Sequence, residues 1–473
     1  MNKILLYLLG PVLVLGLHVR CFSAEPARSD VNDQVGVMVT VYNNNLGLIK
    51  DTRKVSLPPG EGELRFMDVA SHIRPPTVHV RSLNHPTGFT VLEQNYEYDL
   101  MNAKKLLDKY VGRNIKIVDW NRHQDRKEVV EATLLSNTED PIYRINDEIY
   151  LGHPGYRVLP RIPENLIAKP TLMWVYASQG KDAHQLEVSY LTSNLSWRAD
   201  YVMVLSKTET ASDLSGWVTV DNKSGAAYKD ARLKLVAGEV HRVERERAKE
   251  VPQAAMLKAD RAQQFEEKPF FEYHIYDLQR KTTLKDNQTK QISLLEARNA
   301  AVQKDLLVYG VKSYFTRKFM ERTPRQPVSV YIRFRNSREN NLGQPLPAGV
   351  VRLYKQDQDG SQQFVGEDRI GHVPKDEEVR LKIGEAFDVV AERAQTDYRQ
   401  VSTRLHESEW EITLRNHKQE PVKVGIVEPL FGNWKVIANS HPFTKADAFT
   451  IRFDVPVPKD EEVKVRYRVQ VGL

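Results

Sequence analysis

The chain has almost no cysteine. Cys21 is the only one among 473 residues, and it lies in an N-terminal segment that we expect to be removed. The mature protein would then have no thiol, which excludes disulfides, cysteine nucleophiles and thiolate metal sites. Its stability must therefore come from the burial of apolar side chains, which a chain of this length can supply.

A long apolar segment is also missing. The run from Ile4 to Leu17 has 14 residues, whereas a membrane-spanning helix needs about 20. Lys3 precedes the run and Ser23-Ala24 follow it, so we expect a signal peptide over residues 1–24, with cleavage near Ala24. An uncleaved anchor is the alternative. After cleavage we expect no transmembrane span and an exported protein, periplasmic or extracellular, at the bacterial envelope.

No stretch carries the dense positive charge that follows a nucleic-acid backbone. The net charge is +6, and removal of residues 1–24 leaves 66 basic against 62 acidic side chains. We therefore expect no nucleic-acid partner. The pI near 9.0 is compatible with an anionic envelope polymer as partner, or simply with solubility.

Motifs of reactive side chains are absent too. No G-x-S-x-G occurs, and the composition of Ser224-Gly225 is that of an ordinary turn. None of the 13 histidines form H-x-x-x-H or H-E-x-x-H, and Pro75-Pro76 interrupts the densest group, His72, His79 and His85. We predict no catalytic residue, no metal site and no cofactor. A catalytic site assembled from distant residues is the alternative.

Two acidic segments are assigned to turns. Asp357 to Gly360 would need an oxygen ligand where Lys355 stands to bind calcium, so we expect an Asp-Gly hairpin. The sequence V-P-K-D-E-E-V occurs at Val373 to Val379 and again at Val457 to Val463. Its adjacent, solvated acids are unsuited to glycosidase chemistry. The recurrence indicates either reuse of one turn or duplication of a half-domain.

What the chain has in abundance is period-two alternation. In Leu186 to Val240, one parity is apolar at Trp197, Ala199 and Tyr201, which predicts strands with one buried face. The clearest alternation lies in the last 145 or so residues, where turns recur every 8–12 residues, as in antiparallel sandwiches. Thr282 to Leu295 is ambiguous, and its Asp286-Asn287 pair favours strand, turn, strand.

The predicted fold class is mainly β, with tandem antiparallel sandwich or small barrel domains. One helix is expected from Asp99, as its cap, to Tyr110, ending at Gly112. Residues 243–269 form a charged insertion, either a mobile loop or an exposed helix. The expected parts are a signal peptide (1–24), a β unit (36–98), the helix with a small barrel or ribbon (99–165), a central sandwich (170–320) and a C-terminal sandwich (325–473).

Tryptophans are the remaining candidates for ligand contact. We expect Trp197, Trp217 and Trp410 in the core, because they lie on apolar strand faces. Trp434 follows a turn in Phe431-Gly432-Asn433-Trp434 and is the tryptophan we expect to be exposed. Trp434 and Phe431 are therefore the predicted ligand contacts.

Several segments resemble bacterial proteins with the domain of unknown function 4139. They are Leu195 to Tyr201, Gly216 to Thr219, Asn222 to Gly225, Ala231 to Gly238, Asn287 to Gln291, and Glu428 to Leu430 with Trp434. The resemblance covers most of the mature chain and implies an exported, β-rich protein of undetermined activity. Mucoidy-inhibitor-like proteins are distantly similar, but their long coiled coil is missing here. The resemblance supplies no catalytic residues.

The sequence therefore favours a non-enzymatic envelope protein that acts by binding or scaffolding through strand edges and turn loops. Its partner would be an envelope protein or polymer. One alternative is an envelope glycan or peptide hydrolase with a dispersed site. Another is a self-associating surface or assembly protein that uses an edge strand.

Overall fold

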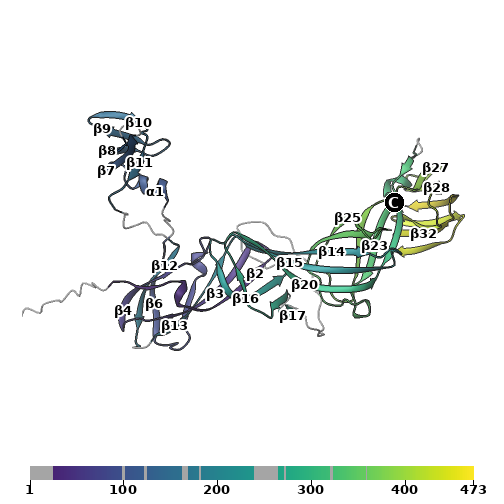
Figure 1. The fold of residues 1–473 in the computed structure, drawn as a ribbon. Helices are drawn as coiled ribbons and strands as arrows, with labels where there is room; N and C mark the ends of the chain where they lie inside the picture. Colours follow the sequence, from purple (N-terminus) through teal and green to yellow (C-terminus); the bar gives the residue numbers. More distant parts are fainter. Residues whose placement is uncertain are drawn as a thin grey trace, which may run out of the picture. The chain divides into compact units, whose positions relative to one another are not determined.

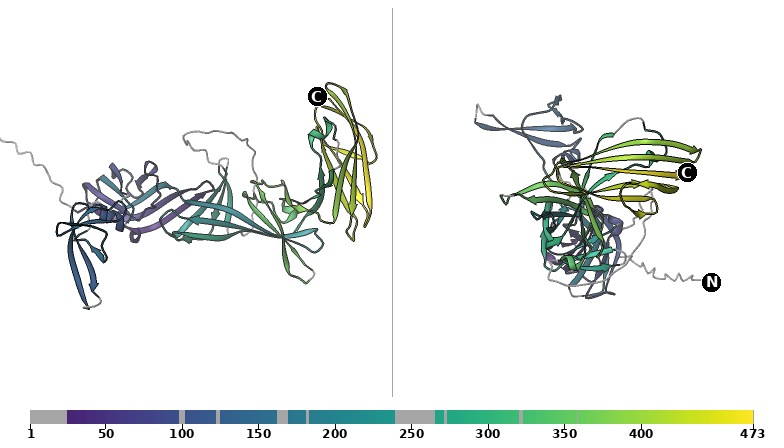
Figure 2. Two further views of the ribbon diagram at one scale, coloured as in Figure 1. Left: turned by 90° about the horizontal axis from the view of Figure 1, so that it is seen from above. Right: turned by 90° about the vertical axis from the view of Figure 1, so that its right-hand side faces the viewer.

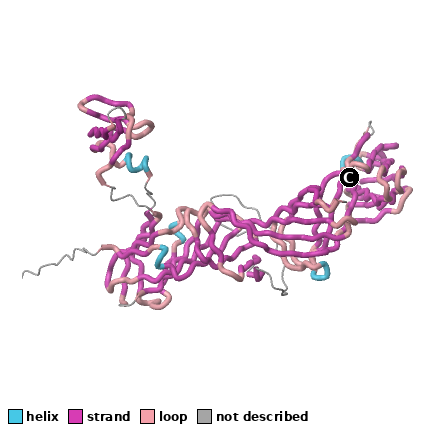
Figure 3. Tube along the Cα trace, viewed as in Figure 1, coloured by secondary structure: helices cyan, strands magenta, loops and turns pink. Residues whose placement is uncertain are grey.

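The computed structural model describes residues 25–97, 102–121, 125–161, 169–180, 183–238, 265–270, 273–319, 323–357 and 359–472. The fold is mainly β, as predicted, and strands dominate every described part of the chain (Figure 3). The signal peptide and most of the charged insertion lie outside these residues. The end of that insertion was predicted wrongly, because Phe265–Phe270 forms strand β17 paired with β18.

Two compact units are present. One comprises residues 1–37 and 50–190, and the other comprises residues 38–49 and 191–473. Among the described residues, no helix is both long and apolar enough to cross a membrane. The domain boundaries expected from the sequence remain predictions.

One five-strand pattern occurs four times along the chain, and we call each occurrence a repeat. Figure 1 labels many of the strands concerned. Repeat 1 consists of β2 (Gln34–Tyr42), β3 (Leu46–Val55), β4 (Gly60–Met67), β12 (Thr171–Ser178) and β13 (His184–Thr192). Repeat 2 consists of β14 (Leu195–Leu205), β15 (Ala211–Asn222), β16 (Tyr228–Ala237), β18 (Tyr273–Leu278) and β20 (Gln288–Ala301). Repeat 3 consists of β21 (Gln303–Tyr309), β23 (Ser329–Arg335), β24 (Gly349–Gln356), β25 (Gln362–Ile370) and β26 (Glu378–Glu385). Repeat 4 consists of β27 (Val389–Ser402), β28 (Leu405–Asn416), β29 (Val422–Pro429), β32 (Thr450–Val457) and β33 (Glu462–Gly472).

The pairing rule is the same in each repeat. The second strand pairs with the first and with the fifth, and the third strand pairs antiparallel with the fourth. The third strand also pairs in parallel with the first strand of the preceding repeat: β16 with β2, β24 with β14, and β29 with β21. The yellow strands of repeat 4 accordingly lie beside green strands of repeat 3 (Figure 2). The sequence predicted antiparallel sandwiches and gave no sign of these parallel pairs, because alternation fixes the buried face and not the neighbouring strand.

Each interior sheet therefore combines strands from two successive repeats. Its core contains the fifth, second and first strands of one repeat, followed by the third and fourth strands of the next repeat. These core orders are β13-β3-β2-β16-β18, β20-β15-β14-β24-β25 and β26-β23-β21-β29-β32. The end sheets contain only part of this order. At the N-terminal end the order is β1-β4-β12-β6, where β1 is Ala27–Ser29 and β6 is Phe89–Glu97. At the C-terminal end it is β22-β27-β28-β33-β30, where β22 is Thr323–Gln326 and β30 is Asn433–Asn439.

A buried asparagine marks the same corner in repeats 2, 3 and 4. Asn222, Asn336 and Asn416 each stand at the end of the second strand and are at most 1% exposed. Their amide nitrogens donate to the carbonyls of Lys285, Pro374 and Pro458, at 3.0, 2.9 and 3.0 Å. Two residues after each of these carbonyls stands a residue with positive φ: Asn287, Asp376 and Asp460. The V-P-K-D-E-E-V recurrence is this corner in repeats 3 and 4, so it reflects a repeated unit.

Additional elements enter mainly between the third and fourth strands. In repeat 1 this position holds β5 (His79–Ser82), β6, α1 (Ala103–Asp108), β7 (Asn114–Asn121), β8 (Arg126–Ser136), β9 (Ile142–Ile145), β10 (Glu148–Leu151) and β11 (Tyr156–Val158). In repeat 2 it holds β17, and in repeat 4 it holds β30 and β31 (Phe443–Asp447). In repeat 3 it is the tight hairpin predicted at the Asp-Gly turn, with Gly360 at φ 87°. A short β19 (Thr282–Leu284) precedes β20, as the strand, turn, strand prediction required.

The inserted small sheet has the order β10-β9-β8-β7-β11, and the described strands leave it open, which matches the ribbon alternative. Helix α1 covers it and is shorter than predicted. Its cap is Asn102, whose side chain accepts a hydrogen bond from the Lys105 N–H, and not Asp99, which lies outside the described residues. Gly112 follows at φ 82°, where a residue without a Cβ is favoured.

The C-terminal core is a sandwich of two sheets. Val424, Ile426 and Phe453 come from one sheet, and Trp410, Ile412 and Val465 from the other, all within one buried cluster. Their alternation along each strand is the period-two pattern of the sequence. This sandwich holds β30 and β31 at its side, each on the edge of a different sheet.

Candidate binding groove and the polar face of the central sheet

Trp434 lies on edge strand β30, opposite Val471 of β33. Strand β31 follows it in the chain and forms the edge of the opposing sheet, paired with β32. Gly432, at φ 58°, allows the chain to turn into β30. The indole therefore stands where the two layers of the sandwich meet at their edges.

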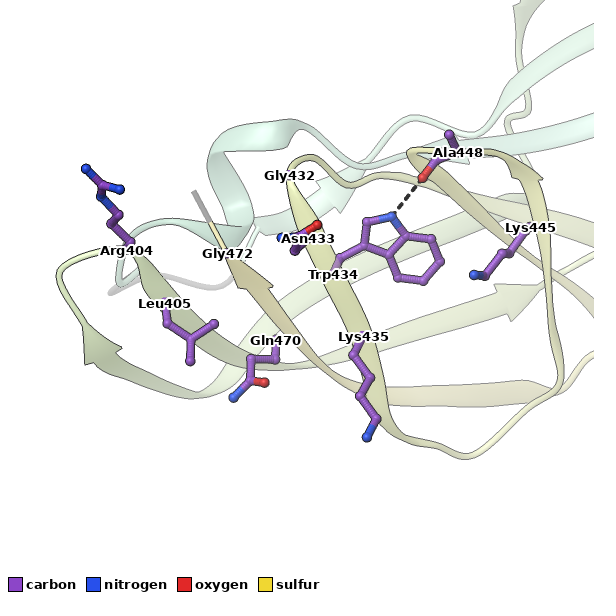
Figure 4. Close-up of a pocket in the computed structure, with 10 residues that line it drawn as sticks. All are labelled: Arg404, Leu405, Gly432, Asn433, Trp434, Lys435, Lys445, Ala448, Gln470 and Gly472. Atoms are coloured by element: carbon purple, nitrogen blue, oxygen red, sulfur yellow. Dashed lines mark hydrogen bonds between the residues drawn. The ribbon is translucent and has the colours of Figure 1, made fainter.

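An open groove of about 610 Å³ surrounds this tryptophan (Figure 4). Its lining combines three basic side chains with small, amide and apolar groups. The residues are Arg404, Leu405, Gly432, Asn433, Trp434, Lys435, Lys445, Ala448, Gln470 and Gly472. Lys445 lies beside the indole, and Arg404 and Leu405 line the other end. Trp434 was predicted here, but nothing in the sequence indicated Arg404, which lies in the turn before β28, or Lys445, which lies on β31.

The groove is positively charged. Arg404, Lys435 and Lys445 have no carboxylate among the lining residues, and no ion pair with a described carboxylate involves them. The Lys445 ammonium lies 4.5 Å from the centre of the Trp434 ring, a cation–π contact. The indole N–H donates to the Ala448 carbonyl at 2.9 Å, which fixes the ring. The arrangement offers an anchored aromatic surface with unneutralised positive charge around it.

Phe431, the other predicted contact, lies outside the groove lining. Like Trp434, it packs half-buried against the buried cluster of the sandwich. Its place just before Gly432 makes it a support for the turn that presents Trp434.

The exposed tryptophans differ from those predicted: Trp434 is only partly exposed, whereas Trp120 is 56% exposed. Trp197 and Trp410 are buried as expected, at 3% and 2% exposure, but Trp217 is 40% exposed. Gly216, Val218 and Val220 of β15 face inward, so Trp217 shares the outer parity with Ser215 and Asp221. It stands opposite Asp200 on β14. The mixed sequence S-G-W-V-T-V allowed either parity, and the glycine concealed the inward one.

Ion pairs cover the outer face around Trp217. Arg198 contacts Asp221 at 2.6 Å and Asp200 at 3.4 Å, and Arg352 contacts Asp200 at 3.3 Å. Thr219 donates to Asp200 at 2.8 Å. Because these charges neutralise one another, the face lacks the excess positive charge of the Trp434 groove.

The carboxylate of Asp221 makes the stability of the protein depend on pH in the acid range. Partial burial opposes its charged form, but hydrogen bonds from Thr289 and Arg198, with the Arg198 charge, lower the pKa of Asp221 below its usual 3.8. Its stabilising contribution is therefore complete above pH 3.8 and is lost as the pH falls through the lowered value. We expect Asp221→Asn to be less stable than the parent at neutral pH and nearly equal to it at about pH 2. Urea unfolding at both pH values measures the difference, and a gap that persists in acid would contradict the assignment.

The model of a domain of unknown function, DUF4139, matches residues 186–431. The chain belongs to the DUF4139 family. No curated protein matches the chain significantly. The DUF4139 match contains Trp217 and its polar face, together with Arg404 of the groove, while Trp434 follows just after its end.

The DUF4139 region also contains a fully buried ion pair. Arg393 of β27 and Glu428 of β29 lie 2.7 Å apart, and both side chains are 0% exposed. Arg393 also donates to Gln326 at 3.1 Å and to the Tyr467 hydroxyl at 3.3 Å. The approach to Glu428 lacks the angle of a good hydrogen bond, so the contact is mainly electrostatic. Burial raises the pKa of Glu428, while the Arg393 charge opposes that rise.

Among the described residues, two histidines have side-chain contacts with serines, both outside the DUF4139 match. One is exposed, between the adjacent residues Ser440 and His441 at 2.9 Å. The other involves the buried His184. His184 Nδ1 is 3.1 Å from the Ser82 hydroxyl, and Nε2 is 3.0 Å from the Ser178 hydroxyl. All three residues are buried, with His184 at 0% exposure. Burial, and then the neighbouring His85, lower the pKa of His184, which favours the neutral ring. With a hydroxyl on each nitrogen and no orienting carboxylate, the contact is suited to core packing.

The described residues contain no candidate metal-binding site. No group of three or more His, Cys, Asp or Glu side chains there is arranged to hold an ion. The acids of the two recurring turns, Asp376 to Glu378 and Asp460 to Glu462, lie in partly or fully exposed turns before β26 and β33.

Proposed function

We propose that this protein is an exported binding protein of the bacterial envelope and that its Trp434 groove holds a segment of an acidic glycan. One observation carries the proposal: Arg404, Lys435 and Lys445 line the same groove as an anchored indole, with Lys445 against the ring and no acid in the lining. Unpaired positive charge around a concave surface attracts anions. The calculated excess of basic side chains after loss of the leader is in keeping with such a ligand.

An acidic sugar fits this lining better than other anions. The indole ring provides an apolar surface for sugar C–H groups, and the Asn433 and Gln470 amides are suited to hydroxyl groups. The three cations would pair with uronate carboxylates or phosphates. A nucleic acid would require a longer basic track than the chain contains. An acidic peptide is the competing ligand, and the experiment distinguishes it.

Binding of polygalacturonate should therefore quench the Trp434 fluorescence with a dissociation constant that rises with salt. Arg404→Ala and Lys435→Ala should each weaken binding about tenfold, because a charge-assisted contact contributes about 1.5 kcal/mol. Trp434→Ala should abolish measurable binding. Isothermal titration calorimetry measures all three. Lys459→Ala, which removes an exposed lysine from a turn outside the groove lining, is the matched control and should bind as the parent does.

Neutral dextran and poly-glutamate complete the design. Dextran should not bind, because the cations would have no partner. Equal binding of dextran and polygalacturonate, or binding of poly-glutamate alone, would refute the acidic-glycan proposal. The hydrolase alternative has no comparable support, because the Ser82–His184 contact is buried and the exposed Ser440–His441 contact lies outside the groove lining.

A further inference from the structure

The two end sheets contain complementary parts of the interior sheet. The C-terminal sheet supplies its fifth, second and first strands, β33-β28-β27. The N-terminal sheet supplies its third and fourth strands, β4-β12. Placed together, with β4 parallel to β27, they give β33-β28-β27-β4-β12, the core order of all three interior sheets.

We propose that copies of this protein associate head to tail, with β4 of one copy paired in parallel with β27 of the next. The partner is a second copy of the same chain. In the interior sheets each first strand pairs with the third strand of the next repeat, and β27 has no such neighbour, whereas β4 of a second copy is a third strand of the same kind. The proposal is independent of the ligand of the Trp434 groove. Such a contact is heterologous, so it joins molecules head to tail into open chains or closed rings.

The position that accepts the incoming strand can be read from the interior sheets. In each, the parallel partner pairs with the C-terminal part of the first strand: Met38–Tyr42 of β2, Ala199–Leu205 of β14, and Leu306–Tyr309 of β21. The equivalent part of β27 is residues 394–402. Within the described residues these pair only with β28, and most of their side chains are exposed. No described strand therefore pairs with this outer edge of β27 where the repeat pattern places one. The segment 314–319 lies beside it, bonded to the side chains of Gln395 and Tyr398, and an incoming strand must pass or displace that segment.

Short strands occupy part of both ends and must be displaced or bypassed. Strand β1 pairs with β4 through three residues, Leu64 to Phe66. Strand β22 pairs with β27 at only Ala391 and Arg393, with an irregular register. The interior parallel pairs hold four to seven residues each. Exchange of a three-residue pair for a longer one favours association, as in donor-strand exchange.

The absence of cysteine from the mature chain permits a direct test by cross-linking. Neighbouring strands lie about 4.8 Å apart, within the range that a disulfide spans. Two single-cysteine proteins, Arg65→Cys on β4 and Thr396→Cys on β27, are mixed under mild oxidation, with Cys21 removed or replaced by serine. Thr396 is the bulge residue that β28 leaves unpaired, so its substitution spares that ladder. Gln400→Cys, nearer the end of β27, tests a shifted register.

We expect Arg65→Cys to form mixed disulfides with Thr396→Cys or with Gln400→Cys at least about tenfold faster than with the control Gln363→Cys, because docking raises the local concentration of the two thiols. Gln363 is an exposed residue of β25, the edge strand of an interior sheet. Sedimentation velocity of the cysteine-free chain should show larger species as concentration rises. Deletion of residues 25–30, which removes β1, should strengthen association. Thr396→Pro should weaken it, while Thr396→Ala should not.

Two results would overturn the proposal. One is cross-linking of Arg65→Cys to the β27 variants at no more than the rate of the Gln363 control. The other is a monomer at every concentration up to about 1 mM for both the full and the β1-deleted chains. Circular dichroism of each variant verifies that the strands are intact.

Discussion

Replacement of Arg393 by methionine should destabilise the protein by about 3–5 kcal/mol. The substitution leaves the Glu428 carboxylate at 0% exposure without its counter-charge. It also removes the donors to Gln326 and to the Tyr467 hydroxyl. Burial already raises the pKa of Glu428, and loss of the arginine would raise it further, so the variant should take up a proton on folding. Urea unfolding at pH 7 and pH 5 measures both effects, with the smaller loss at pH 5.

The double variant Arg393→Met/Glu428→Leu separates the ion pair from the packing. Removing both charges together should restore most of the lost stability, because neither desolvation cost remains. Arg298→Met is the surface control. Its side chain is 78% exposed beside Glu296, so it should change stability by less than about 0.5 kcal/mol. A loss of less than 1 kcal/mol for Arg393→Met would show that the pair is not essential to the sandwich.

Replacement of Asn416 by alanine should cost about 2–4 kcal/mol. The Asn416 amide nitrogen donates to the carbonyls of Glu420, Val457 and Pro458, and its oxygen accepts from the Lys418 N–H. The residue is 1% exposed, so water cannot take over these bonds. Thermal and urea unfolding of the variant measure the cost.

Asn336→Ala tests whether the corner has the same role in repeat 3. It should show a similar loss, because Asn336 donates to the Gln344 and Pro374 carbonyls and accepts from the Gly343 N–H. Asn433→Ala, at an exposed position on β30, should change stability by less than about 0.5 kcal/mol. If all three variants were equally stable, the corner would be a consequence of the repeat and not a support for it.

Alternation along the chain was enough to predict the fold class. Trp197, Tyr201 and Leu233 are buried because each occupies the apolar parity of its strand, and both parities are visible in the sequence. Trp217 shows the limit of this reasoning. Gly216 takes the inward position there, and a residue without a side chain gives no hydrophobic signal.

The pairing order and the binding groove were beyond sequence reasoning for a different reason. Neighbouring strands such as β24 and β14 are separated by some 150 residues in the sequence, and the sequence of neither strand indicates which strand it pairs with. Trp434 was found because a turn precedes it, whereas Arg404 and Lys445 join it only through the pairing of β28, β30 and β33 and of β31 with β32. In the sequence, the repeat was visible only as the seven-residue recurrence V-P-K-D-E-E-V in repeats 3 and 4. The corner of repeat 2 shares the asparagine hydrogen bond with these two but not their sequence.

The connection between the third and fourth strands is where the repeats differ most in length and content. A hairpin of a few residues is sufficient there in repeat 3, while repeat 1 accommodates a helix and a separate small sheet at the same point. Loop-closure entropy rises only slowly with length, so large additions at this point cost the frame little. The Trp434 groove is built partly from such an addition, β30 and β31. Segments inserted between the third and fourth strands can therefore differ from repeat to repeat, while the other strands keep the same pairing.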